Sequence, residues 1–234
     1  MNTTDPNILT DSARKYLKIK SQVELLYSQS TVTFTFPVIF AAIIGIVVWD
    51  VANRKILLGW LAVVILYALI RYIILWQYSK IEKTPENYQR WLNHFRLVVF
   101  LSGIMWGCAG IILIPYDPQN IIEFTLYNGL TMLAVCGLVA GAVISYSISL
   151  TTILLYTLPA LVPPALYLIS IGDKYNSALG GFILMYFFFI SLTAYKLNQQ
   201  LMAYAFREYE YQNMKQHYFR LKKHMDETTR RLSA

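Results

Sequence analysis

Six long apolar stretches constrain the fold of this chain more than any other feature of its sequence. A helix needs about 20 apolar residues to cross the hydrocarbon core of a bilayer. Because little polar sequence separates the stretches, they do not suit the buried helices of a soluble protein. The sequence therefore predicts an all-α polytopic membrane protein with six transmembrane helices. The expected spans are about Thr33–Trp49, Ile56–Gln77, Leu97–Tyr116, Ile121–Ser145, Leu150–Ile171 and Ala178–Leu197.

The composition agrees with membrane insertion and excludes several other classes of protein. Apolar residues make up 56% of the chain and charged residues 14%. Globular domains carry roughly 25% charged residues. A disordered tail, a secreted disulfide scaffold and a typical soluble enzyme are therefore excluded. Cys108 and Cys136 lie inside apolar stretches and lack the spacing of a disulfide framework or a metal site.

The basic residues are distributed unevenly along the predicted topology. Six spans place both termini on one side, and of the 20 Lys and Arg residues only Arg54, Lys55 and Lys174 fall on the other side. The positive-inside rule therefore places both termini in the cytoplasm, as in a multi-pass protein of the bacterial inner membrane. Basic residues beside membrane spans pair with anionic lipid, so the net charge of +7 predicts the lipid bilayer as a partner and not nucleic acid.

The spans divide the chain into three expected parts. Residues 1–32 form a cytoplasmic segment whose amphipathic helix, over 11–29, lies on the inner leaflet. Residues 33–197 form the six-span bundle, and residues 198–234 form a cytoplasmic helix. Within the bundle, the charged segment 78–96 predicts a short interfacial helix that starts near Thr84–Pro85 and turns Trp91 and Phe95 toward lipid.

The C-terminal segment has the pattern of a helical rod. Neither Gly nor Pro occurs from Phe182 to Ala234. About 35 helical residues would extend roughly 50 Å beyond the membrane. A heptad seam favours a dimeric coiled coil over the alternative, a basic helix on anionic lipid. The seam consists of Tyr204, Tyr211, Tyr218, Met225 and Leu232.

Small residues and prolines inside the spans indicate close packing and bending. Two pairs of glycines four residues apart let helices approach closely, and packing is their simplest role. These pairs are Gly103 with Gly107 and Gly137 with Gly141. Pro159, Pro163 and Pro164 in the fifth span predict a kink, which is either structural or part of a gate.

Few ionisable residues lie within the spans, and they are functional candidates because charge is costly to bury in lipid. Arg71 in the second span either extends to the headgroups or bridges to the cytoplasmic helix near Asn198. Glu123 in the fourth span either lies at the outer interface or belongs to a pocket for a small amphiphilic ligand. The other candidate ligand-binding residues are Ser102, Trp106, Tyr127, Asn128 and Thr131.

Catalytic motifs are not visible in the sequence. His94, His217 and His224 lack paired carboxylates beside them, and no Ser/His/Asp arrangement, Walker loop or metal cluster occurs. We therefore expect neither a cofactor nor a metal ion. A transporter is weakly supported, since no inverted repeat and no pair of broken spans in matching positions is apparent.

An ordered set of short motifs extends over about residues 20–215. The set comprises Val23–Ser30, Trp60 and Arg71 in span two, Trp91, Met105–Gly107, 137–142, 145–149, Leu158–Pro163 and Lys196–Leu201. In this order the motifs resemble the N-terminal six-helix integral-membrane sensor module of bacterial sensor histidine kinases and diguanylate cyclases. The resemblance implies that a stimulus passes through a signalling helix to a kinase or cyclase domain. Neither a phosphoacceptor motif at His224 nor a cyclase signature occurs, so that domain is absent from this chain.

We therefore expect a homodimeric sensory input module of a two-component or related signalling system. The alternatives are a small-molecule transporter or channel, and a membrane-embedded enzyme or assembly factor. Residues expected to relay the signal or to pack are Arg71, Gly103, Gly107, Gly137, Gly141, Pro159, Pro163, Asn198, Tyr204, Tyr211, Tyr218 and Met225.

Overall fold

The chain folds into helices throughout the residues that the computed structural model describes, 11–80 and 84–232. No strand occurs in these ranges, so the expected all-α class is confirmed. The helices are α1 (Asp11–Ser28), α2 (Ser30–Val47), α3 (Arg54–Ser79), α4 (Pro85–Ile112), α5 (Ile121–Tyr146), α6 (Leu150–Ile171) and α7 (Lys174–Leu232).

Five of these helices, α3 to α7, are long and apolar enough to cross a bilayer. The apolar part of α2 among the described residues, Thr35–Val47, is shorter. Large apolar side chains remain exposed along α3, including Leu66 at 57% and Trp76 at 55%. A surface of this kind suits lipid and not water. The chain is therefore a multi-pass membrane protein.

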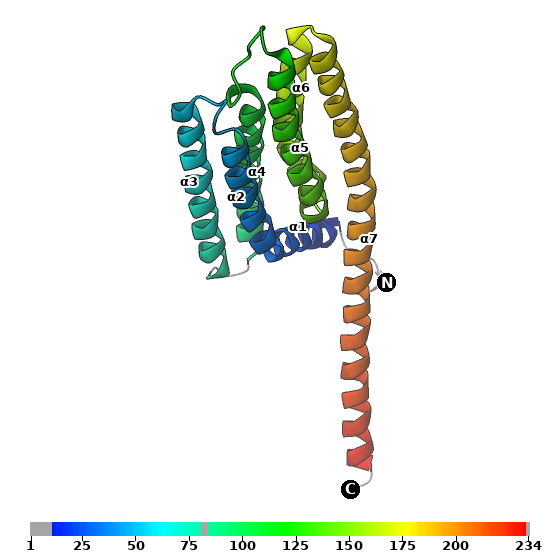
Figure 1. The fold of residues 1–234 in the computed structure, drawn as a ribbon. Helices are drawn as coiled ribbons and strands as arrows, with labels where there is room; N and C mark the ends of the chain where they lie inside the picture. Colours follow the sequence, from blue (N-terminus) through cyan, green and yellow to red (C-terminus); the bar gives the residue numbers. More distant parts are fainter. Residues whose placement is uncertain (1–10, 81–83, 233–234) are drawn as a thin grey trace. The chain divides into compact units, whose positions relative to one another are not determined.

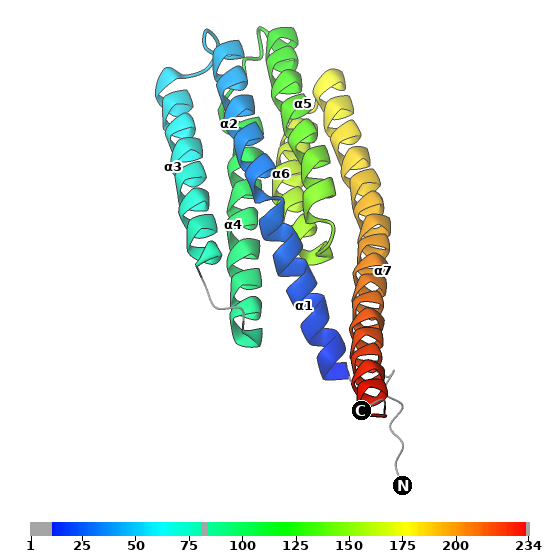
Figure 2. The same ribbon diagram turned by 90° about the horizontal axis from the view of Figure 1, so that it is seen from below.

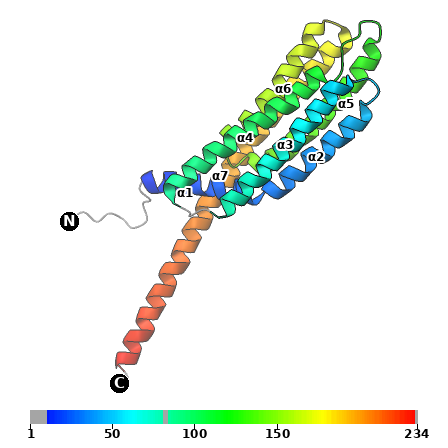
Figure 3. The ribbon, with the colours of Figure 1, turned by 90° about the vertical axis from the view of Figure 1, so that its left-hand side faces the viewer.

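The chain divides into two compact units, Met1–Asn198 and Gln199–Ala234. In the first unit α2 to α6 run side by side as a helical bundle (Figures 1 and 3). The second unit is the C-terminal part of α7, and Tyr211 and Met214 within it are exposed.

The most extensive helix contact in the bundle joins α4 and α6. A Cβ atom at Gly103 would collide with the carbonyl oxygen of Tyr156, and one at Gly107 would collide with that of Pro159. Since Pro163 has no N–H, the Pro159 carbonyl four residues earlier receives no helical hydrogen bond from it. The two glycines thus let α4 lie directly against the backbone of α6, which is close packing of the kind expected for a small-residue pair.

Helix α4 begins where the sequence predicts but continues further. The Thr84 hydroxyl oxygen accepts a hydrogen bond from the Asn87 N–H at 3.4 Å, and Pro85 is the first helical residue. The helix then runs without a break to Ile112, so the prediction that a short interfacial helix starting near Thr84–Pro85 is separate from the following span is wrong. Phe95 is only 4% exposed, so its predicted orientation toward lipid is also wrong. An amphipathic pattern identifies an apolar face, but it does not distinguish lipid from protein as the cover.

That cover is provided in part by α1, which lies across one end of the bundle (Figure 1) and is seen from below in Figure 2. The predicted amphipathic helix over 11–29 is confirmed by the bounds of α1. Its apolar residues Val23, Leu26 and Tyr27 are at most 5% exposed, and α1 packs against α4. The apolar face expected to rest on the inner leaflet is therefore buried against the bundle.

Candidate functional site

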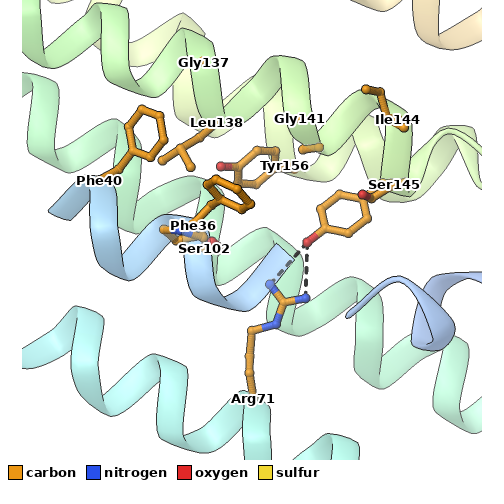
Figure 4. A pocket seen from close by; sticks show the side chains of 13 residues that line it. Phe36, Phe40, Arg71, Ser102, Gly137, Leu138, Gly141, Ile144, Ser145 and Tyr156 are labelled. Atoms are coloured by element: carbon orange, nitrogen blue, oxygen red, sulfur yellow. Dashed lines mark hydrogen bonds between the residues drawn. The ribbon is translucent and has the colours of Figure 1, made fainter. Parts of the chain in front are cut away.

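A cavity of about 410 Å³ lies among α2, α3, α4, α5 and α6, within the first compact unit. This volume falls in the range of roughly 300–1,000 Å³ that small-molecule pockets occupy. Figure 4 shows the side chains that surround it. The lining includes Phe36, Phe40, Arg71, Ser102, Tyr146 and Tyr156.

The charged group of this cavity is the guanidinium of Arg71, which comes from the C-terminal half of α3. Arg71 is 5% exposed, and both of its terminal nitrogens donate to the hydroxyl oxygen of Tyr146 at 3.2 Å (Figure 4). The guanidinium carbon also lies 5.8 Å from the ring centre of Tyr67 and 5.7 Å from that of Phe95. These contacts hold Arg71 inside the bundle and do not fit the alternative in which it extends along the surface to the headgroups.

The walls of the cavity become apolar with distance from Arg71. Leu138 and Tyr146 both come from α5 and are eight residues apart, which separates them by about 12 Å along the helix. Phe40 lies near Leu138 in Figure 4, away from the guanidinium. Gly137 and Gly141 on the same helix present no side chain to the space. The cavity therefore has a charged, polar end at Arg71 and Tyr146 and a mainly apolar end toward Phe40 and Leu138, with Ser102 and Tyr156 adding hydroxyl groups to the lining.

The turn that follows Tyr146 is bound by two other helices. The side-chain amide of Gln22 in α1 donates to the Ile148 carbonyl at 3.1 Å. The side-chain amide of Asn198 in α7 donates to the carbonyls of Ser147 at 2.6 Å and Ile148 at 2.9 Å. Ser147 and Ile148 are themselves buried. Arg71 thus reaches Tyr146, and Asn198 binds the next two residues of the same chain segment.

A cluster of aromatic rings extends this contact to α1. Tyr27 stacks on Tyr78 at 3.8 Å and meets the edge of Phe95 at 5.2 Å, and Phe95 in turn lies 5.6 Å from Tyr146. The Tyr27 hydroxyl donates to the Trp91 carbonyl at 3.4 Å. Burial, followed by the neighbouring Tyr78, raises the pKa of Tyr27, so this ring stays neutral.

Of the residues expected to form a ligand pocket, Ser102 lines this cavity. Trp106 is buried in an edge-to-face contact with Trp60 at 5.3 Å. Asn128 is buried and donates to the Gly110 carbonyl at 3.2 Å, and the Thr131 hydroxyl donates to the Tyr127 carbonyl at 3.0 Å. The Glu123 side chain is exposed at the start of α5.

The residues expected to relay a signal lie in three different settings. Gly103, Gly107 and Pro159 form the α4–α6 contact, whereas Pro163 is exposed. Gly137 and Gly141 line the cavity, and a Cβ at Gly141 would meet nothing within 4 Å. In the second unit the described seam residues are exposed: Tyr204, Tyr211, Tyr218 and Met225.

The sequence did not point to Tyr146, Tyr156, Phe36 or Gln22 as site residues. Tyr146 lies within the motif 145–149, which was noted for its order along the chain and not for its chemistry. The sequence feature that could have identified Tyr146 is its position near the end of α5, the helix that also carries Gly137 and Gly141.

Comparisons with known proteins return nothing for this chain: no family model, no curated protein and no solved structure matches it. Within residues 11–80 and 84–232, no group of three or more His, Cys, Asp or Glu side chains is placed to hold a metal ion.

Proposed function

We propose that the chain is the membrane-embedded sensory input module of a bacterial signal-transduction protein. A stimulus in the Arg71 cavity changes the position of Tyr146, the turn after it moves, and Asn198 passes that movement into the following part of α7. A kinase or cyclase domain receives it. The observation that carries this proposal is the pair of hydrogen bonds from Asn198 to Ser147 and Ile148, directly after the residue that Arg71 binds.

The proposed topology has six spans, with α2 as the first, and both termini in the cytoplasm. The distribution of basic residues supports it, since only Arg54, Lys55 and Lys174 fall at the outer side. Single cysteines at Tyr116 and Met225, in a Cys108→Ala, Cys136→Ala background, test it in intact cells. We expect an impermeant maleimide to label Tyr116→Cys and not Met225→Cys. The reverse result would exclude a cytoplasmic output.

The proposed oligomer is a dimer joined along the second unit. Tyr204, Tyr211 and Tyr218 are 68%, 55% and 64% exposed in the single chain, which supports a seam that a second copy covers. Oxidative crosslinking in membranes tests this in the same cysteine-free background. Cysteine at Tyr211 or Tyr218 should crosslink quickly, and cysteine at Asn213, on the opposite face of the helix, slowly. Equal crosslinking rates at all three positions would contradict a dimer joined along this helix.

The relay itself is tested by removing the amide of Asn198. Asn198→Ala deletes two hydrogen bonds to backbone carbonyls, so the turn and α7 are no longer joined at this point. The crosslinking rates at Tyr211→Cys and Tyr218→Cys should change relative to one another. Gln212→Ala, which deletes a bond within α7 to Glu208, is the control and should leave the ratio of rates unchanged. If both substitutions leave the ratio unchanged, Asn198 is not part of a relay.

A further inference from the structure

We propose that the Arg71 cavity binds a single-chain amphiphile with a carboxylate head, such as a free fatty acid, whose head lies at Arg71 and Tyr146. This inference deepens the proposed sensory function, on which its consequence for signalling rests. The binding site itself is argued from the cavity and is tested separately.

The polar end of the cavity matches a carboxylate. A guanidinium presents N–H groups in a planar fork that matches the two oxygens of a carboxylate. At this site two of the nitrogens of Arg71 converge on one neutral oxygen, the hydroxyl of Tyr146, at 3.2 Å each. A carboxylate that enters the cavity offers the same N–H groups a charged acceptor. The Tyr146 hydroxyl then donates to the acid as well. The chemistry of this end selects an anion.

The remainder of the cavity is mainly apolar. From Tyr146 to Leu138 the lining runs about 12 Å along α5. Gly137 and Gly141 leave room on that wall, and a Cβ at Gly141 would meet nothing within 4 Å. Phe36, Phe40 and the ring of Tyr156 supply further apolar surface (Figure 4). An extended hydrocarbon chain fills such a space, and a compact hydrophilic anion does not.

The cavity is accessible from the surface of the bundle. Phe36 and Ile144 line the cavity and are 53% and 69% exposed, so the cavity is open at the outer surface of α2 and α5. In a membrane this surface faces lipid, and an amphiphile dissolved in the bilayer enters sideways without crossing water. The volume of about 410 Å³ favours one chain, so we commit to a free acid and not to a two-chain phospholipid.

Photolabelling of the full chain in phosphatidylcholine nanodiscs tests the proposal. The probe is a diazirine analogue of dodecanoic acid, used at alkaline pH where the acid is ionised. We expect saturable labelling of the α2 and α5 segments that line the cavity, displaced by dodecanoic acid. Dodecanol should compete about 10- to 150-fold less well, because it lacks the charge-assisted hydrogen bonds. Because the acid is already dissolved in hydrocarbon, chain length should change its affinity only through the fit to the cavity, and chains too long for the space should label more weakly.

Two variants and one control make the result specific. Arg71→Gln should weaken labelling about 10- to 150-fold. Arg96→Gln is the matched control, since Arg96 donates to the Ser149 hydroxyl at 3.4 Å and does not line the cavity, and it should label as the unchanged chain does. Gly141→Phe adds a ring where a Cβ would meet nothing within 4 Å, on the α5 wall of the cavity, and leaves the Arg71 side chain itself unchanged; it should also weaken labelling strongly. It keeps the proposal falsifiable if Arg71→Gln fails to fold.

Besides an absence of binding, three results would overturn the inference. Two of them are unchanged labelling in Gly141→Phe and equal competition by dodecanol. The third is equal competition by phosphatidylglycerol, which would assign the site to a bilayer headgroup. The sensory function is judged by a second measurement on the same samples, the crosslinking rate of Tyr211→Cys with and without dodecanoic acid. Saturable binding without a change in the crosslinking rate of Tyr211→Cys would support the ligand site and contradict the proposed relay from the cavity to α7. Absence of binding would contradict the ligand and leave the Asn198 test to decide the relay.

Discussion

The two glycine pairs look alike in sequence, and the structure predicts that they respond in opposite ways to the same substitution. At Gly107 a methyl group collides with the backbone carbonyl of Pro159, which no side-chain rotation relieves. Overpacking of this kind costs about 3 kcal/mol at the upper end of its range. The better helix propensity of alanine offsets about 1 kcal/mol. Gly107→Ala should therefore destabilise the bundle by about 2 kcal/mol.

At Gly141 the added methyl group meets nothing within 4 Å, so only the propensity gain of about 1 kcal/mol remains. The two variants should differ by about 3 kcal/mol, or roughly 6–12 °C in Tm for a chain of this size. Thermal unfolding of both proteins in the same detergent, followed by tryptophan fluorescence, measures this gap. Equal melting temperatures, or a lower one for Gly141→Ala, would refute the described α4–α6 contact.

Two further predictions concern single hydrogen-bonding groups. Tyr146→Phe removes the acceptor of two hydrogen bonds from a charged donor and should lower the unfolding free energy by about 1.5–3 kcal/mol. Tyr186→Phe removes one hydrogen bond to the Cys136 carbonyl and should lower the unfolding free energy by about 1 kcal/mol. Equal losses in the two variants would contradict the Arg71 contact. Slight burial acts to raise the pKa of Asp173, but hydrogen bonds from Asn176 and Tyr175 outweigh it and hold that pKa below its usual value. Its ionised form therefore stabilises the start of α7 above about pH 4, and this contribution disappears as the pH falls through the lowered value. The difference in Tm between the natural chain and Asp173→Asn should shrink between neutral pH and pH 3 or so; a constant difference would contradict the lowered pKa.

Much of the architecture was predictable because it depends on local properties of the sequence. Apolar length predicted the positions of α3, α5 and α6, and Thr84–Pro85 marked the start of α4 through capping and proline geometry. What failed was the assignment of faces. Phe95 and the apolar side of α1 were expected against lipid, and each is covered by protein, because the periodicity of a helix does not identify its neighbour.

The candidate site was less predictable, for a related reason. Arg71 was recognisable as a charge inside a span, but its partner Tyr146 is 75 residues away and belongs to another helix. Two options were considered for Arg71, the headgroups and the region of Asn198. In the structure Arg71 contacts Tyr146, and Asn198 binds the next residue, Ser147. Arg71 therefore lies near the Asn198 contact but reaches it only through Tyr146. Pairings of this kind depend on helix packing, which one sequence does not specify.

The central claim, that the Arg71–Tyr146 contact is coupled to α7 through the turn at Ser147 and Ile148, is tested most directly by hydrogen–deuterium exchange on the full chain in nanodiscs. Tyr146→Phe should speed amide exchange in residues 199–215, whereas Tyr186→Phe should leave exchange in that segment unchanged. Identical exchange of 199–215 in the unchanged chain and in Tyr146→Phe would contradict the coupling.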